Sequence, residues 1–323
     1  MTKLLRRQAL KSTAGALAAI SMPATCGQIS SAIAADKPPV SAIIDTHTHF
    51  YDPSRPQGVP WPSKDDPLLY RPVFPAEYQL FAQPLGVTGT IVVEASPWAE
   101  DNQWVLDLAE KETFIVGLVG NLKPGEDEFS PLLERFSQNR LFRGIRISHS
   151  LMKTRLDQPA FLRDLKALTD HDLELDINGG ADMLPDVARL AETLPTLRIV
   201  VNHCANVRID GQSPPEPWQR DMRALQKHAS VYCKVSGLVE GTGRRDGTAP
   251  SDVAFYKPTL DIIWNAFGED RVIYGSNWPV SKRFASYDVV QRIVTDYFAE
   301  HGRQASEKYF HHNALAAYKP VQR

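Results

Sequence analysis

Apolar residues occur along this chain in short continuous runs that alternate with segments of helical period. A continuous apolar run of five to eight residues is typical of a strand that is buried on both faces. The runs predict eight strands, at 42–46, 89–95, 114–121, 142–148, 173–178, 197–203, 230–237 and 271–275. The 3.6-residue period predicts helices between them at 75 to about 85, 102–111, 129–135, 159–169, 183–194, 218–227 and 256–267, and two closing helices at 287–300 and 305–318.

Eight strands that alternate with helices over about 280 residues predict one α/β domain, a (β/α)8 TIM barrel at residues 42–319. A doubly wound open sheet is the alternative arrangement of parallel strands and helices. The barrel is favoured because no glycine-rich phosphate loop follows the first strand. No change of composition along the chain indicates a second domain.

The segment after the first predicted strand is long and irregular. Residues 52–75 contain seven prolines and show no helical period. A loop of this length inside a compact domain usually forms a lid or a wall of an active site. We therefore expect this proline-rich loop to border the functional site.

The first 34 residues have the pattern of an export signal. Arg6 and Arg7 open a sequence that resembles the twin-arginine signal, small and apolar residues follow, and Ala32-Ile33-Ala34 fits an A-x-A cleavage site. A membrane anchor is the alternative, but the apolar stretch is too short and too weakly hydrophobic for a stable span. Cleavage after Ala34 leaves 323 − 34 = 289 residues, with 35–41 as a linker, and predicts a periplasmic or extracellular protein.

Composition narrows the class of partner. The 323 residues are 43% hydrophobic and carry a net charge of −2, which is ordinary for a globular protein. Nucleic acid is excluded as a partner because phosphate binding requires a basic face. A small-molecule substrate is the remaining expectation, and the sequence does not indicate the oligomeric state. Cys204 and Cys233 are too few for a disulfide framework, so we expect buried thiols, with a single bridge between them as the alternative.

Polar residues follow most of the predicted strands at their carboxyl ends, which is where barrel active sites form. His47 and His49 are two residues apart, so on a strand they face the same way, about 6.6–7 Å apart along the chain. Two imidazoles in this position can bind one metal ion or flank one substrate. The other strand ends contribute Glu94, Asn121, Arg146, His149, Asp176, Asn178, His203, Lys234, Ser236, Asn277 and Trp278.

An ordered set of motifs on these strand ends resembles one family. The set consists of Ile44-Asp45-Thr46-His47-Thr48-His49, Arg143-Gly144-Ile145-Arg146, Val201-Asn202-His203, Lys234-Val235-Ser236-Gly237-Leu238 and Gly275-Ser276-Asn277-Trp278-Pro279-Val280. It resembles the amidohydrolase-2 branch of the amidohydrolase superfamily. Within that branch it is similar to the sugar-lactonase group, which includes fuconolactonase and rhamnonolactonase.

The resemblance implies a metal site and a substrate site. His47, His49 and His203 would be the ligands of one divalent ion, zinc or manganese, although some lactonase relatives work without metal. Arg146 would hold a substrate oxygen or carboxylate. Most relatives carry Asp where this chain has Asn277, and an amide can position water but cannot act as a general base. The fifth strand lacks the histidine of the two-metal enzymes, so a binuclear centre is not expected.

The residues themselves suggest roles in hydrolysis. His203, with an ordinary pKa of about 6.5, is the first candidate for the base, and Glu94 is the second. Asn277 is the third catalytic candidate, as the residue that positions the water. The predicted substrate contacts, besides Arg146, are Lys234, Asn178, Trp98 and Trp278, because amide, ammonium and aromatic groups suit a sugar-like ring.

The resulting functional hypothesis is a hydrolase that opens a lactone of a sugar acid at a mononuclear-metal or metal-independent site. Another reaction of the same superfamily, decarboxylation or C–N hydrolysis, is one alternative. A secreted barrel that binds carbohydrate without catalysis is the other alternative, and Asn277 is the residue that favours it.

Overall fold

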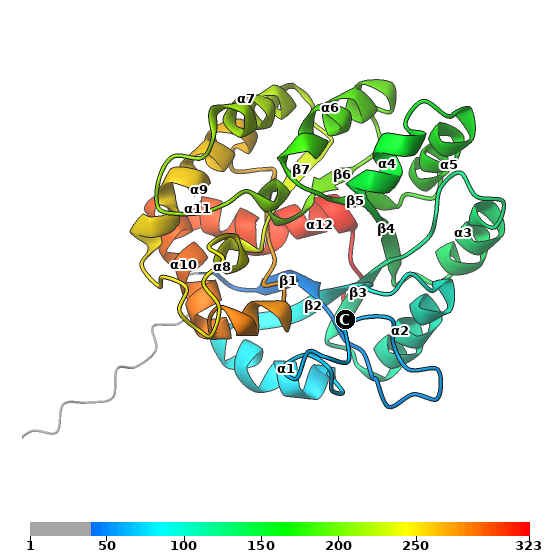
Figure 1. Cartoon of the computed structure of the whole chain (residues 1–323), viewed down its shortest axis with the longest axis horizontal. Helices are drawn as coiled ribbons and strands as arrows, with labels where there is room; N and C mark the ends of the chain where they lie inside the picture. The colour runs from blue at the N-terminus through cyan, green and yellow to red at the C-terminus, as the bar shows by residue number, and fades with distance from the viewer. Residues whose placement is uncertain (1–39) are drawn as a thin grey trace, which may run out of the picture. The chain divides into compact units, whose positions relative to one another are not determined.

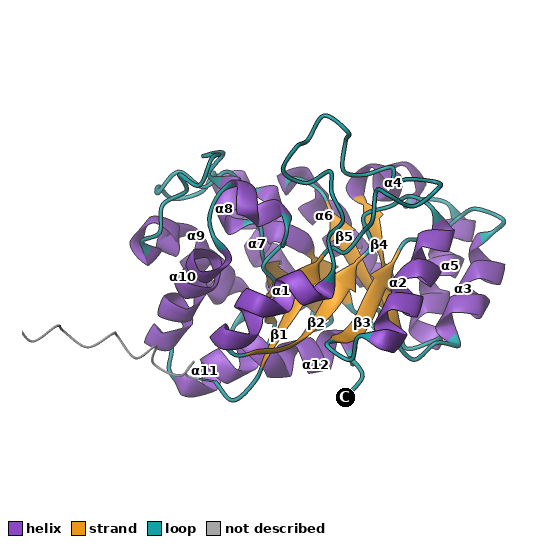
Figure 2. Ribbon diagram, turned by 90° about the horizontal axis from the view of Figure 1, so that it is seen from below, coloured by secondary structure: helices purple, strands orange, loops and turns teal. Residues whose placement is uncertain are grey.

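The computed structural model describes residues 40–323, so the predicted export signal at 1–34 and most of the predicted linker lie outside the described part. Eight parallel strands follow one another around the centre and helices surround them (Figures 1 and 2). The strands are β1 (Ile43–Thr48), β2 (Val87–Val93), β3 (Ile115–Gly120), β4 (Phe142–Ser148), β5 (Glu174–Asn178), β6 (Ile199–Val201), β7 (Val231–Val235) and β8 (Val272–Tyr274).

The helices lie outside the strands, as the predicted alternation requires. They are α1 (Pro75–Ala82), α2 (Ala99–Lys111), α3 (Phe129–Ser137), α4 (His149–Arg155), α5 (Pro159–Asp170), α6 (Leu184–Thr193), α7 (Glu216–Ala224), α8 (Leu238–Gly241), α9 (Val253–Phe267), α10 (Tyr287–Glu300), α11 (Arg303–Glu307) and α12 (Asn313–Tyr318). The short helices α4 and α8 were not predicted. None of the helices between residues 40 and 323 has both the length and the apolar character that a membrane span requires.

The predicted (β/α)8 barrel is confirmed. Each strand pairs in parallel with the next, from β1 to β8. The first and last strands also meet, because Thr48 and Trp278 form a parallel bridge and the amide of His49 donates to the carbonyl oxygen of Trp278 at 2.9 Å. The alternative of a doubly wound open sheet is therefore wrong.

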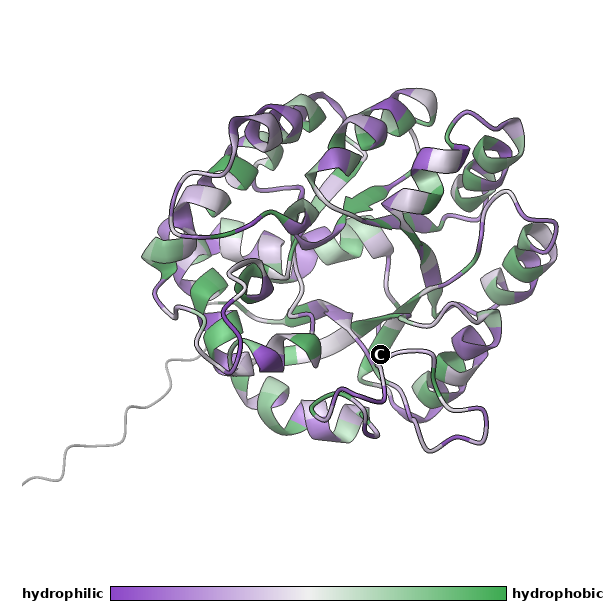
Figure 3. Cartoon of the chain, viewed as in Figure 1, coloured by the Kyte–Doolittle hydropathy of each residue, from purple (hydrophilic) through white to green (hydrophobic). Residues whose placement is uncertain are grey.

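Two apolar layers hold the barrel. The larger layer lies between strands and helices, and the hydropathy colouring shows apolar residues concentrated on the strands and the adjoining helix faces (Figure 3). The smaller layer includes Ile44, Ile91 and Ile273 together with Ala317 and Tyr318 of α12. Helix α12 lies at the end of the strands opposite the loops that carry α4 and α8 (Figure 2). The other end of the barrel, where the loops carry α4 and α8, is therefore open for a functional site.

One strand boundary differs from its prediction in a way that affects the site. The sixth strand was predicted to run to His203, but β6 ends at Val201 and a short turn, Asn202–Asn206, follows. His203 and the two residues after it have φ values of 52–56°, which is the left-handed region. Non-glycine residues rarely adopt this conformation, so the surrounding structure must hold the turn in place.

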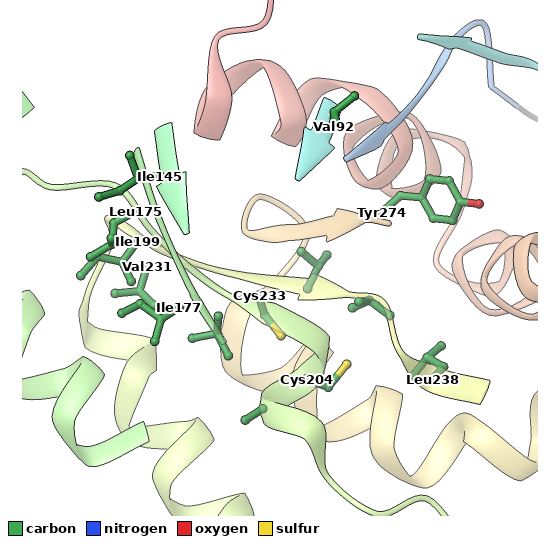
Figure 4. Packing of buried hydrophobic residues seen from close by; sticks show 14 of the residues in the cluster. Val92, Ile145, Leu175, Ile177, Ile199, Cys204, Val231, Cys233, Leu238 and Tyr274 are labelled. Carbon is green, nitrogen blue, oxygen red and sulfur yellow. The ribbon is translucent and has the colours of Figure 1, made fainter. Parts of the chain in front are cut away.

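Both cysteines are buried and free, and Figure 4 shows their side chains among the apolar residues of β5, β6 and β7. Burial of Cys233 and its hydrogen bond with Cys204 raise the pKa of its thiol. The predicted reading as buried thiols therefore agrees with the structure, and the single bridge is not formed.

The proline-rich loop lies against the site, as predicted from its length. Tyr51 and Val73 pair at its base, through backbone hydrogen bonds of 3.1 and 2.8 Å. The ring of Trp61 packs edge-on against His49, with centroids 5.5 Å apart, and Asp66 forms an ion pair with Arg283. The loop thereby forms one wall of the space above the strands.

A buried carboxylate joins the two strands at which the barrel closes. Oδ1 of Asp45 accepts the backbone amides of His47 at 3.1 Å and Ser276 at 2.9 Å. Oδ2 accepts the hydroxyls of Tyr78 at 2.7 Å and Tyr287 at 3.3 Å. Asp45 is fully buried, so water cannot replace these four bonds.

We expect Asp45→Ala to lower the free energy of unfolding by about 3–5 kcal/mol, because two amides and two hydroxyls lose their buried acceptor. Asp45→Asn keeps one acceptor oxygen and should cost about half as much. Urea unfolding followed by circular dichroism measures both. The control is Asp107→Ala at an exposed i,i+4 pair with Gln103, with an expected change below about 0.5 kcal/mol. Equal losses for Ala and Asn would contradict this role.

Candidate active site

A pocket of about 620 Å³ opens at the carboxyl ends of the strands. It borders a second hollow of about 400 Å³, and both are lined by Arg146 and Asn178. Five predicted site residues line the main pocket, namely His49, Arg146, Asn178, His203 and Asn277. Five further polar residues line it that the sequence did not single out, namely Asp66, Asn206, Glu240, Arg245 and Arg283. The structure thus brings residues from β1, β4, β5, β6 and β8 to one space.

Three histidines cluster at the floor of this pocket. The ring of His47 lies 5.0 Å from that of His49 and 4.4 Å from that of His203, measured between centroids. Gly237 makes room for His203, since a Cβ at Gly237 would lie 2.9 Å from the Cβ of His203. His47 and His49 therefore converge, as their spacing of two residues on the first strand predicted.

Burial and nearby cations keep these imidazoles neutral. Burial lowers the pKa of His49 to about 3, with a further contribution from Arg146. Burial also holds the pKa of His203 well below its usual value, and Lys234 and Arg146 lower it further. His47 is shifted in the same direction, by burial first and His203 second. His203 is therefore a much weaker base than an imidazole with an ordinary pKa of about 6.5.

Hydrogen bonds distinguish the three rings. Nδ1 of His49 lies 2.6 Å from the carbonyl oxygen of Val93, which can only accept, so His49 carries its proton there and Nε2 has a free lone pair. Nδ1 of His203 lies 2.8 Å from Oγ of Ser236. Nε2 of His47 is buried and has no hydrogen-bond partner among residues 40–323. Nδ1 of His47 instead faces Nζ of Lys234 at 3.4 Å. Each ring is therefore held in place through its Nδ1 atom.

Lys234 lies beneath the histidines rather than in the pocket. Its side chain is fully buried, its Nζ donates to Oδ2 of Asp176 at 2.7 Å, and it lies 3.4 Å from Nδ1 of His47. The hydroxyl of Tyr318 donates to the other oxygen of Asp176 at 2.8 Å. This placement differs from the predicted substrate contact, because Lys234 contacts His47 and not the open space.

Two tryptophans also lie away from the pocket. Trp278 is fully buried and packs against Phe50, Tyr78 and Phe81, with centroids 5.2–5.9 Å apart. Trp98 is 41% exposed at the start of α2 and is not among the residues that line the pocket. Neither Trp278 nor Trp98 is therefore placed for the predicted contact with a sugar. Trp61 of the proline-rich loop does line the pocket.

Glu94 points to a small neighbouring hollow, which it lines with Arg55 and Asp101. Its Oε1 accepts the amide of Ser96 at 2.5 Å. Burial raises the pKa of Glu94 to about 7. Arg146 donates to the backbone carbonyl oxygen of Glu94 at 2.5 Å, so the contact between these two residues does not use the carboxylate.

Asn277 and Glu240 form the polar pair on the opposite side. Nδ2 of Asn277 donates to Oε1 of Glu240 at 2.8 Å, and both residues line the pocket. Asn277 has a φ of 57°, a left-handed value that turns the chain directly after β8. Glu240 belongs to α8. It was not among the predicted site residues, because α8 itself was not predicted. The only signal was a carboxylate four residues after Ser236, the last polar residue of the predicted seventh strand.

The histidines do not form a complete metal site. His49 has the arrangement of a ligand, since its Nδ1 proton is bound by a carbonyl. His47 has the reverse arrangement, because the ammonium of Lys234 faces Nδ1 and favours the tautomer in which Nε2 carries the proton and cannot bind a metal. Across residues 40–323, no three His, Cys, Asp or Glu side chains are placed to hold one metal ion.

The fold and the polar residues at the carboxyl ends of the strands are those of a barrel enzyme. The chain matches the family model described as Amidohydrolase over residues 44–319. The protein therefore belongs to the amidohydrolase family and is a hydrolase.

Individual relatives agree with this assignment. The chain is 31% identical over 242 residues to L-fucono-1,5-lactonase of Burkholderia ambifaria, covering 74% of this chain and 81% of that protein. It is 30% identical over 279 residues to L-fucono-1,5-lactonase of Burkholderia multivorans, covering 82% and 91%. A crystal structure of an amidohydrolase from Burkholderia multivorans with bound zinc superimposes with a TM-score of 0.75 at 26% identity, over 86% of this chain and 99% of that one.

We expect Lys234→Met to lower the free energy of unfolding by about 3–5 kcal/mol, because Asp176 then remains buried without its cation. The double variant Lys234→Met/Asp176→Asn should regain at least about 1 kcal/mol of that loss, since it removes the unpaired charge and keeps an acceptor for Tyr318. Urea unfolding of the three proteins measures this difference. A double variant no more stable than Lys234→Met would show that the unpaired Asp176 carboxylate does not cause the loss of stability.

Proposed function

We propose that the protein hydrolyses the lactone of a sugar acid and opens the cyclic ester to the hydroxy acid. The observation that carries this proposal is the meeting of His49, His203 and Arg146 in one polar pocket of about 620 Å³. A pocket of this volume is suited to a small ligand such as a single sugar ring. The names of the two Burkholderia lactonases support the choice of a sugar-acid lactone.

The proposed chemistry uses charge that is already in place. The guanidinium of Arg146 is positioned in the pocket by the carbonyl oxygen of Glu94, so it can stabilise the oxygen on which negative charge develops when water attacks the ester carbonyl. The neutral imidazoles can hydrogen-bond the carbonyl and the sugar hydroxyls without adding charge. Asn178 at the end of β5 offers an amide to the same ring.

We propose further that the reaction needs no metal. The cation of Lys234 against His47 opposes a site made of His47, His49 and His203, so the alternative predicted from the sequence, one zinc or manganese ion, is not favoured. The zinc in the Burkholderia multivorans structure is a property of that protein.

The test is a rate measurement on the purified protein with sugar-acid lactones, before and after dialysis against a chelator. We expect unchanged hydrolysis after chelation, verified by elemental analysis. We expect His203→Asn to lower kcat/KM at least about 10²-fold, because a group that contacts the reacting carbonyl is lost. Amides and aromatic carboxylates serve as comparison substrates. Turnover of those compounds without turnover of lactones would overturn the proposal, as would ligand binding with no turnover at all.

We also propose that the protein acts outside the cytoplasm, after removal of residues 1–34. The support is the pair Arg6 and Arg7 with the A-x-A pattern before Ala35. N-terminal sequencing of the secreted protein should begin at Ala35. Replacing both arginines by lysine should leave the uncleaved precursor in the cytoplasm, and normal export of that variant would contradict the proposed route.

A further inference from the structure

Resting on the proposed hydrolysis, we propose that Glu240 is the proton acceptor for the attacking water and that Asn277 holds Glu240 in position. Neither the family match nor the names of the relatives assign a role to Glu240. The proposal gives this chain a carboxylate base although Asn277 itself cannot act as one.

The geometry supports this assignment. Glu240 and Asn277 line the same pocket as His49 and His203, so a water that binds beside the Asn277 amide would be next to the carboxylate. The bond from Nδ2 of Asn277 to Oε1 fixes the carboxylate at 2.8 Å. Oε2 is buried and has no hydrogen-bond partner in the part of the chain that the structure describes. A buried carboxylate with one oxygen left without a partner is readily protonated, because the ionised form is poorly solvated.

The electrostatic environment gives Glu240 a suitable proton affinity. Burial raises its pKa to about 7, and the hydrogen bonds to its own backbone and to Asn277 oppose that shift only in part. A base works best when its pKa is close to the working pH. Tyr256 of α9 interacts with its charge, and the other titratable or charged residues that line the pocket are His49, His203, Arg146, Arg245, Arg283 and Asp66.

Two other candidates fit less well. His203 has a strongly lowered pKa, so it is a poor proton acceptor. Glu94 has a pKa similar to that of Glu240, but its carboxylate binds the Ser96 amide and borders the hollow near Arg55 instead of the main pocket. Glu240 is the residue that combines a near-neutral pKa with a place on the pocket wall.

Glu240 accepts one proton and returns it within each turnover. A water proton passes to the Glu240 carboxylate while the water oxygen bonds to the lactone carbonyl carbon, and the carbonyl electron pair moves to the oxygen beside Arg146. When that pair returns, the ring C–O bond breaks. The leaving alkoxide takes the proton from Glu240, which regenerates the carboxylate and yields the hydroxy acid.

We expect Glu240→Gln to lower kcat about 10²- to 10³-fold with little change in KM, because a general base is lost and the pocket is preserved. Since the acceptor must be ionised, wild-type kcat should rise with pH through about 7, and this limb should disappear in Glu240→Gln. The double variant Glu240→Gln/Asn277→Asp exchanges the amide and the carboxylate across the same hydrogen bond. It should regain at least about 10-fold of the lost rate and the pH limb.

A matched control is Glu192→Gln, the same substitution at an exposed residue that pairs with Lys227 on the outside of the barrel. Its kcat and pH profile should equal those of the wild type. Wild-type kcat in Glu240→Gln, with lactone hydrolysis intact, would overturn the role of Glu240 and leave the proposed function standing.

A second measurement does not depend on the substrate. Infrared difference spectra of wild type against Glu240→Gln should show one carboxyl group that loses its proton near pH 7. A Glu240 that stays ionised from about pH 5 to about pH 9 would overturn the proposal even if no lactone is turned over. Absence of lactone hydrolysis together with this titration would instead reject only the proposed substrate.

Discussion

The positions of His47, His49 and Asn277 depend on how the barrel closes between β1 and β8. The two strands share a single bridge, so the backbone ladder alone fixes them weakly. The buried Asp45 carboxylate supplies the missing constraint, because one of its oxygens accepts amides from both strands. Those amides belong to His47 and Ser276, which are next to or part of the site. The distance between the histidines and Asn277 is therefore set by the same interaction that closes the fold.

A second buried carboxylate organises the charges under the pocket. Burial lowers the pKa of Lys234, and Asp176 opposes this shift. Lys234 and Arg146 in turn lower the pKa of His47 and His203. Burial and these two cations keep the histidines neutral, whereas burial raises the pKa of Glu240 to about 7. One environment thus moves the proton affinities of imidazoles and carboxylates in opposite directions, which separates hydrogen-bonding groups from proton-accepting groups.

The sequence predicted the parts of this arrangement that depend on period. Parallel strands carry side chains to a known end of the barrel, so the pocket positions of His49, Arg146 and Asn277 could be predicted. Depth could not be predicted in the same way, because a polar residue at a strand end can point into the pocket or into the barrel. Lys234 and Trp278 point inward for that reason, since each finds buried partners there. Glu240 was missed because α8, a single turn, has no hydrophobic period.

The pairs His203–Ser236 and Asn277–Glu240 also stabilise the backbone, because His203 and Asn277 have left-handed conformations. His203 and Asn277 both adopt conformations that cost free energy in an L-residue, and each has a side-chain partner on or just after β7, namely Ser236 and Glu240. The strained turns after β6 and β8 are thus both held from the segment that lies between them. An asparagine at position 277 donates a hydrogen bond to a carboxylate, whereas an ionised aspartate there would repel it. The amide and Glu240 are therefore complementary, and each residue makes the other suitable for its place.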